Sequence, residues 1–218
     1  MLILFDLDDT LVDQATAARE AADALVNHLG LESSDFHARW FAALDHHYAR
    51  YLAGEIGFQE QRRARVRDTL RMDLSDDDAD ATFQVYLAAY ERNMRLFPDV
   101  LPCLNALAKH SLGIVTNGNT QQQRRKLTRL GILDRFACIV VSDEFGSSKP
   151  DPRIFPRACE LAATAPPDAL HVGDLYDVDV VGAERAGLRA VWLDRSAAGI
   201  QQPARTRITT LASLPALV

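Results

Sequence analysis

Short, continuous apolar runs recur along most of the chain and predict buried β-strands. Each run is four or five residues long, and none alternates cleanly between apolar and polar positions. Runs of this kind are typical of strands that are covered on both faces, as in a parallel sheet. The five runs are Leu2–Phe5, Leu112–Thr116, Cys138–Ser142, Ala169–Val172 and Ala190–Leu193.

Helical patterns separate the last four runs. The segment 120–130 ends at Gly131, and the segment 179–186 ends at Gly187. Glycine is common just after the last residue of a helix. Between these two segments, apolar residues recur at helical spacing over 154–162. Strands that alternate with helices over short connections predict an α/β fold with a doubly wound parallel sheet.

Residues 14–94 follow a different pattern, because they contain no strand-like run and about four helical ones. One apolar face ends at Gly30, and others recur over 36–52 and 83–94, with a shorter helix near 58–70. We therefore expect a helical cap domain over 14–94, inserted after the first strand. The core domain then comprises residues 1–13 and 95–218.

Composition narrows the function classes only modestly. The chain has 218 residues and a net charge of −6, which argues against a nucleic-acid-binding surface, since phosphate contacts need clustered lysine and arginine. The three cysteines form neither a CxxC pair nor a zinc spacing and suit a reducing cytoplasm. No apolar run approaches the roughly 20 residues of a membrane span. We expect a cytoplasmic protein with no membrane contact.

Polar groups follow the ends of four predicted strands. Open α/β folds bind ligands in the crevice at the carboxyl ends of their parallel strands, so these groups are expected to converge there. Like charges at this density repel, which points to a cation among them. The groups are Asp6, Asp8, Asp9 and Thr10 after the first strand; Thr116, Asn117 and Gly118 after the second; Lys149 after the third; and Asp174 and Asp179 after the fourth.

These motifs resemble those of the haloacid dehalogenase (HAD) superfamily. The resemblance rests on "DLDDT", "IVTNGNTQQQRRKL", "SKPDPRIFPRA" and "GDLYDVD", and it covers nearly the whole chain. The position of the helical insertion is similar to that of the subfamily with small α-helical caps. The residues of the second and third motifs resemble those of the family's nucleotide and sugar-phosphate phosphatases. One departure is Leu175, where the family often has a small polar residue.

The resemblance and the residues agree on the expected catalytic groups. Asp6 is expected to attack phosphorus and form an aspartyl-phosphate. Asp8 is expected to protonate the leaving alkoxide and then to deprotonate a water. Lys149 is expected to offset the charge of the nucleophile and of the phosphoryl oxygens. Thr116, with the N–H groups near Asn117 and Gly118, is expected to bind the remaining oxygens.

The expected cation is Mg²⁺, which prefers oxygen ligands and keeps several waters. Asp6 and Asp174 are the expected side-chain ligands. The resemblance implies the Asp8 carbonyl as a third ligand. Asp179 is expected either to contact the ion directly or to support one of its ligands. The expected substrate is a small phosphomonoester: a nucleoside monophosphate, a sugar phosphate or phosphoglycolate.

Other functions remain open at this point. A phosphomutase of the same fold needs the same residues. A dehalogenase is disfavoured, because its leaving group needs no acid and Asp8 is present. A receiver-like protein that binds phosphate and metal without catalysis would carry its phosphorylated aspartate after a later strand and would lack a helical insertion.

The helix near 58–70 carries a cluster of arginines. Helical projection places Arg62 and Arg65 on the side of Phe58, whereas Arg63 and Arg67 point away. Arg65 is the candidate for contact with an anionic part of the substrate. The alternative is that these arginines pair with acidic residues inside the helical domain.

Overall fold

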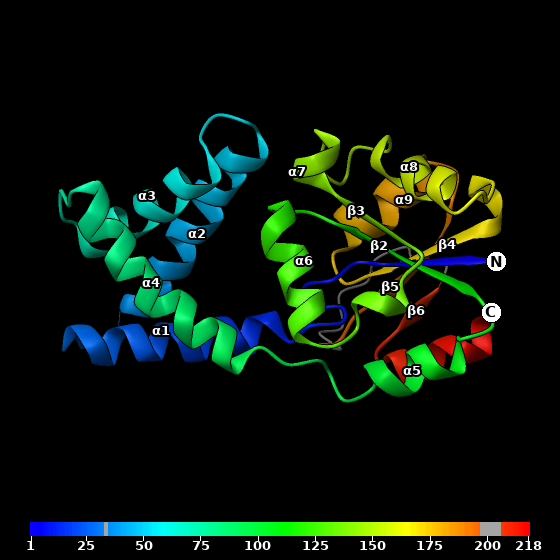
Figure 1. Cartoon of the computed structure of the whole chain (residues 1–218), viewed down its shortest axis with the longest axis horizontal. Helices are drawn as coiled ribbons and strands as arrows, with labels where there is room; N and C mark the ends of the chain where they lie inside the picture. Colours follow the sequence, from blue (N-terminus) through cyan, green and yellow to red (C-terminus); the bar gives the residue numbers. More distant parts are fainter. Residues whose placement is uncertain (33–34, 197–205) are drawn as a thin grey trace. The chain divides into compact units, whose positions relative to one another are not determined.

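All five expected strands are present in the computed structural model, which describes residues 1–32, 35–196 and 206–218. They pair in parallel, and a sixth short strand extends one edge, giving the order β3-β2-β1-β4-β5-β6 (Figure 1). The order reverses at β1, which confirms the doubly wound sheet. The strands are β1 (Leu2–Phe5), β2 (Ser111–Thr116), β3 (Cys138–Val141), β4 (Ala169–Gly173), β5 (Arg189–Leu193) and β6 (Arg207–Ile208).

Helices cover both faces of this sheet, which explains why its strands read as continuous apolar runs. On one face, Phe155 from α8 and Ala183 from α9 pack in one core cluster with Leu2 and Leu4 of β1. Helix α5 and the C-terminal 3₁₀ segment lie across the sheet from them (Figure 1). The helices of this unit are α5 (Val100–Ala106), α6 (Thr120–Arg129), α7 (Ser142–Phe145), α8 (Ile154–Leu161) and α9 (Val181–Arg185), and the C-terminal segment is Leu211–Leu217.

The chain divides into two compact units. The first comprises Met1–Asp13 and Leu96–Val218 and contains the sheet; the second is Gln14–Arg95 and is entirely helical. The helical unit has its own core, in which Trp40 is fully buried against Phe36, Phe83 and Tyr86. Its helices are α1 (Gln14–Leu29), α2 (Phe36–Leu52), α3 (Phe58–Leu70) and α4 (Asp76–Asn93).

Among the helices that the structure describes, none has the length and apolar character needed to cross a bilayer.

Candidate active site

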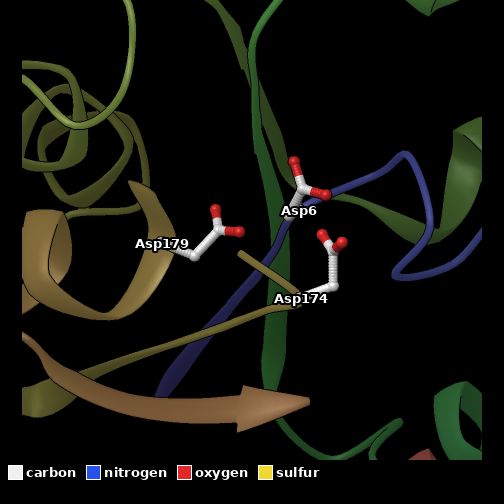
Figure 2. A group of neighbouring side chains, drawn as sticks. All are labelled: Asp6, Asp174 and Asp179. Carbon is white, nitrogen blue, oxygen red and sulfur yellow. The ribbon is translucent and has the colours of Figure 1, made fainter. Parts of the chain in front are cut away.

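Three aspartates, from the segments that follow β1 and β4, meet where the strand order reverses. Asp6 follows β1, and its N–H donates to the Val172 carbonyl of β4 at 2.9 Å, which ties the ends of the two strands together. Asp174 follows β4 directly, and Asp179 lies in a π-helical turn just beyond it. One carboxylate oxygen from each aspartate lies within 4.8 Å of the other two (Figure 2).

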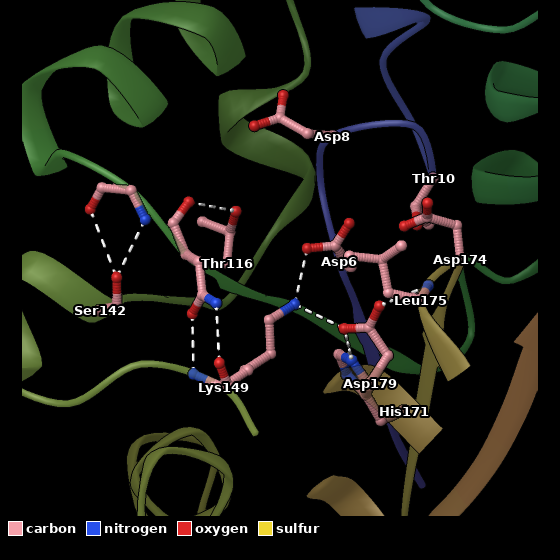
Figure 3. A network of polar contacts seen from close by, with 12 residues as sticks. Asp6, Asp8, Thr10, Thr116, Ser142, Lys149, His171, Asp174, Leu175 and Asp179 are labelled. Atoms are coloured by element: carbon pink, nitrogen blue, oxygen red, sulfur yellow. Dashed lines mark hydrogen bonds and ion pairs between the residues drawn. The ribbon is translucent and has the colours of Figure 1, made fainter. Parts of the chain in front are cut away.

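Lys149 joins two of these carboxylates. Its Nζ donates to Oδ1 of Asp6 and to Oδ1 of Asp179, each at 2.6 Å (Figure 3). The lysine side chain is only 2% exposed. An ammonium group this deeply buried requires paired charge, and the two carboxylates supply it.

Asp179 is held by several donors at once. Besides Lys149, the ring Nε2 of His171 lies 3.1 Å from Oδ1, and the Leu175 N–H donates to Oδ2 at 3.0 Å. The turn also presses Asp179 onto the backbone of Gly173, where an added Cβ would lie 2.3 Å from the Asp179 Cγ. Both oxygens of Asp179 thus have partners within the protein. Only glycine fits at position 173 with this arrangement.

The electrostatics of the three aspartates differ sharply. Burial, reinforced by the neighbouring carboxylates, raises the pKa of Asp6 to about 7 despite Lys149. Burial and the charge of Asp6 raise the pKa of Asp174 to about 8. Burial would also raise the pKa of Asp179, but Lys149 and His171 outweigh it and hold that pKa well below its usual range. Asp6 and Asp174 thus form a pair of carboxylates with too little positive charge around them.

Asp8 does not belong to this group of side chains. Its carboxylate is turned away from Asp6 and Asp174 (Figure 3) and is bound by helix α6. Lys126 Nζ donates to Oδ1 at 2.6 Å, and Gln123 Nε2 donates to Oδ2 at 2.9 Å. Neither Lys126 nor Gln123 was singled out from the sequence. Their i, i+3 spacing, on the face of α6 that carries the buried Leu127, is the signal that would have identified them.

The groups after β2 are brought to the same end of the sheet, but their partners differ from those expected. The Asn117 amide exchanges two hydrogen bonds with the backbone of Lys149. The Gly118 N–H donates to Ser142 Oγ at 2.9 Å, which contradicts its expected role as a phosphate donor in this structure. The Thr116 hydroxyl accepts from Gln123 at 2.8 Å and lies beside the site.

The first turn of α6 is likewise already capped. The Thr120 N–H donates to Asp143, and the Gln122 N–H donates to the Asn119 side chain. These N–H groups are therefore used within the protein rather than presented to an anion.

Arg65 lies in the interior of the helical unit and not on its surface. Its guanidinium sits 3.9 Å from the centroid of the Trp40 ring and 4.8 Å from that of Tyr86, and the residue is 3% exposed. Nε also donates to the Trp40 carbonyl at 3.3 Å. The expected substrate contact is thus contradicted by the burial of the side chain. Arg63 and Arg67, expected to face solvent, pair with acidic residues near the start of α4.

Comparisons with known proteins show which family and fold the chain shares. Residues 1–187 match a family model described as "Hydrolase: haloacid dehalogenase-like hydrolase". A glyceraldehyde 3-phosphate phosphatase from Methanopyrus kandleri is 32% identical over 202 residues, with coverage of 88% of this chain and 83% of that protein.

Solved structures share the fold over almost the whole chain. A HAD hydrolase from Bacillus subtilis, YfnB, bound to magnesium, has a TM-score of 0.84 at 24% identity and covers 99% of this chain and 97% of its own. A 2-haloacid dehalogenase from Pseudomonas syringae pv. Tomato has a TM-score of 0.73 at 31% identity, with coverage of 99% and 96%.

Proposed function

This chain belongs to the haloacid dehalogenase-like hydrolase family, and we propose that it hydrolyses phosphomonoesters of small molecules through an aspartyl-phosphate on Asp6. The observation that carries the proposal is the separation of two carboxylates in one turn. Asp6 lies with Lys149 and Asp174 at the strand ends, whereas Asp8, two residues later, is held by α6. A nucleophile and a separate proton-transfer group are what this reaction needs.

The first half-reaction transfers the phosphoryl group to the protein. An Asp6 carboxylate oxygen attacks phosphorus, and the bond from phosphorus to the ester oxygen breaks. The leaving alkoxide takes a proton from the Asp8 carboxyl, and the product alcohol departs.

The second half-reaction restores the protein. Asp8, now ionised, removes a proton from a water whose oxygen attacks phosphorus. The bond between phosphorus and the Asp6 oxygen breaks, inorganic phosphate leaves, and Asp8 is again protonated. The Lys149 ammonium stays beside Asp6 in both halves and stabilises the negative charge there.

The carboxylate pair fits a divalent cation. Burial raises the pKa of both Asp6 and Asp174, and no cationic side chain of the described residues lies within ion-pair distance of Asp174. Asp6 and Asp174 would hold Mg²⁺, with the Asp8 carbonyl as a further proposed ligand. When bound, the ion supplies positive charge to the phosphoryl oxygens. The Asp179 carboxylate already has hydrogen-bond partners in Lys149, His171 and the Leu175 N–H. We therefore propose that it supports the metal ligands without binding the ion itself.

Three alternative functions are a dehalogenase, a receiver-like protein and a phosphomutase. A halide leaves without a proton, so a carboxylate held two residues from the nucleophile has no task in dehalogenation. A receiver-like role disagrees with the hydrolase family match and with the position of Asp6 after β1. A phosphomutase uses the same groups, and it is told apart by its product, a phosphate ester in place of inorganic phosphate.

The helical unit has a proposed role in substrate choice. We propose that residues 14–95 form a cap that restricts the protein to small substrates, such as sugar phosphates, nucleoside monophosphates or phosphoglycolate. Glyceraldehyde 3-phosphate joins this panel because of the Methanopyrus kandleri relative. We also propose a cytoplasmic location, because the three cysteines form no CxxC pair and suit a reducing compartment.

Hydrolysis of para-nitrophenyl phosphate tests the proposal. The wild type and Asp6→Asn are compared with Mg²⁺ and with excess chelator, followed by the substrate panel. We expect metal-dependent release of inorganic phosphate by the wild type and none by the variant. A folded wild type that releases chloride from 2-chloropropionate, and no phosphate from any ester, would establish dehalogenation instead.

A further inference from the structure

Two polar side chains lie on the buried face of helix α6. Gln123 and Lys126 are each 2% exposed and are three residues apart, beside the fully buried Leu127. Burying an ammonium group is costly unless a charged partner compensates it. Such residues on a core face therefore need a reason beyond packing, and the groups they contact supply one.

Their common partner is the Asp8 carboxylate. Lys126 Nζ donates a hydrogen bond to Oδ1, and Gln123 Nε2 donates one to Oδ2. A carboxylate oxygen has two lone pairs, so one donor on each oxygen fixes the plane of the group and leaves positions open for a proton. The side chain of Asp8 is 21% exposed, so the held carboxylate still reaches solvent.

Gln123 also connects Asp8 to the end of β2. The same Nε2 that donates to Asp8 lies 2.8 Å from Thr116 Oγ1 and 3.1 Å from the Asn117 carbonyl. Helix α6 begins only a few residues after Thr116, so the β2 end and Gln123 belong to one local structure. Gln123 therefore links the Asp8 carboxylate to the end of β2, where Thr116 and Asn117 lie.

We propose that Lys126 and Gln123 are positioning residues that hold Asp8 for both proton transfers. The inference rests on the proposed function, which assigns those transfers to Asp8. It adds that the carboxylate is oriented by α6, through one charged and one neutral donor. A reacting group displaced by about 1 Å loses about 100-fold in rate, so removal of either donor should slow catalysis.

The variants Lys126→Met and Gln123→Met remove one donor each at similar side-chain length. With the best phosphomonoester of the panel, we expect kcat to fall about 10- to 100-fold in each variant, with KM changed by less than about threefold. Lys126→Arg, which keeps a cationic donor, should recover most of the rate. Arg125→Met removes an exposed cation from the same helix and serves as the matched control, with kcat unchanged.

A double variant separates positioning from a general structural effect. If Lys126 acts through Asp8, Lys126→Met should cost little further rate in an Asp8→Asn background, whereas independent effects would multiply. Melting curves show whether each variant folds. If Lys126→Met does not fold, Gln123→Met is combined with Asp8→Asn in the same way.

The inference is overturned if kcat of Lys126→Met and Gln123→Met stays within about twofold of the wild type, or if the losses multiply with that of Asp8→Asn. Both results require an active wild type, so they leave the proposed function standing. A wild type with no phosphatase activity overturns the proposed function and this inference together.

Discussion

Asn117 and Lys149 exchange two hydrogen bonds, although they lie on loops after different strands. The Asn117 Nδ2 donates to the Lys149 carbonyl at 2.9 Å, and the Lys149 N–H donates to Asn117 Oδ1 at 2.8 Å. The asparagine therefore fixes the backbone from which the lysine reaches Asp6. The side chain of Asn117 is thus used to place the Lys149 ammonium.

Asn117→Ala should displace Lys149 and slow the reaction. Both backbone groups of Lys149 lose their partner, which should cost about 1–3 kcal/mol of unfolding free energy. We expect kcat to fall by about 10-fold or more through misplaced charge at Asp6. Denaturant unfolding and steady-state kinetics measure the two effects. Full activity in the destabilised variant would show that Lys149 does not depend on Asn117.

Gly173→Ala should disturb both stability and catalysis. The new Cβ would lie 2.3 Å from the Asp179 Cγ, so Asp179 must move and Lys149 with it. A loss of about 1–3 kcal/mol is expected from such overpacking, together with a lower kcat. Gly57→Ala is the control, because no atom lies within 4 Å of its added Cβ. It should cost at most about 1 kcal/mol, as the N-cap of α3, and leave kcat unchanged.

The raised pKa values of Asp6 and Asp174 make the stability of the metal-free protein depend on pH. Both lie above the ordinary value of 3.8, at about 7 and about 8. The native state therefore holds more protons than the unfolded chain in this range. The stability that these two groups contribute is complete below about pH 4 and is lost as pH rises through about 7 and 8.

Mg²⁺ should reverse that loss, because it binds the ionised carboxylates and competes with their protons. We expect the melting temperature to rise more on addition of Mg²⁺ at about pH 8.5 than at about pH 5.5. Differential scanning calorimetry at both values, with and without Mg²⁺, measures this. Asp174→Asn should remove the Mg²⁺-dependent rise. An equal rise at both pH values would contradict the assignment of these carboxylates as ligands.

Arg65→Met should act on stability and not on substrate affinity. The guanidinium stacks on Trp40 inside the helical core, so its removal should cost about 1–3 kcal/mol. KM for phosphomonoesters should stay within about twofold, since the buried group is not presented to an anion. Arg71→Met removes an exposed cation from the end of the same helix as a control. A raised KM with an unchanged melting temperature would restore the substrate contact expected from the sequence.

The sequence predicted the sheet well because its strands are covered on both faces and their connections are short. Continuous apolar runs identified β1 to β5, and the parallel arrangement brought Asp6 and Asp174 to one edge. The two-residue strand β6 has too few residues to form a pattern. Helix α5 was missed because it has only seven residues and contains Pro102.

Hydrogen-bond partners were much harder to predict, because they depend on geometry that residue spacing does not give. Gly118 was expected to bind phosphate, but Ser142 lies close enough to accept from its N–H. Helical projection placed Arg65 on the correct side of α3, yet that side faces the core of the unit. Gln123 and Lys126 were not singled out from the sequence, because spacing places them on the Leu127 face of α6 but does not show that this face meets Asp8.

The most direct test of the account is to trap the phosphorylated protein. The wild type with Mg²⁺ and para-nitrophenyl phosphate is quenched in acid within one turnover, digested, and analysed by mass spectrometry. The account predicts one added phosphoryl group on the peptide that contains Asp6, and none in Asp6→Asn. Phosphate release by a wild type that never carries the group, or by Asp6→Asn at the wild-type rate, would contradict an aspartyl-phosphate mechanism.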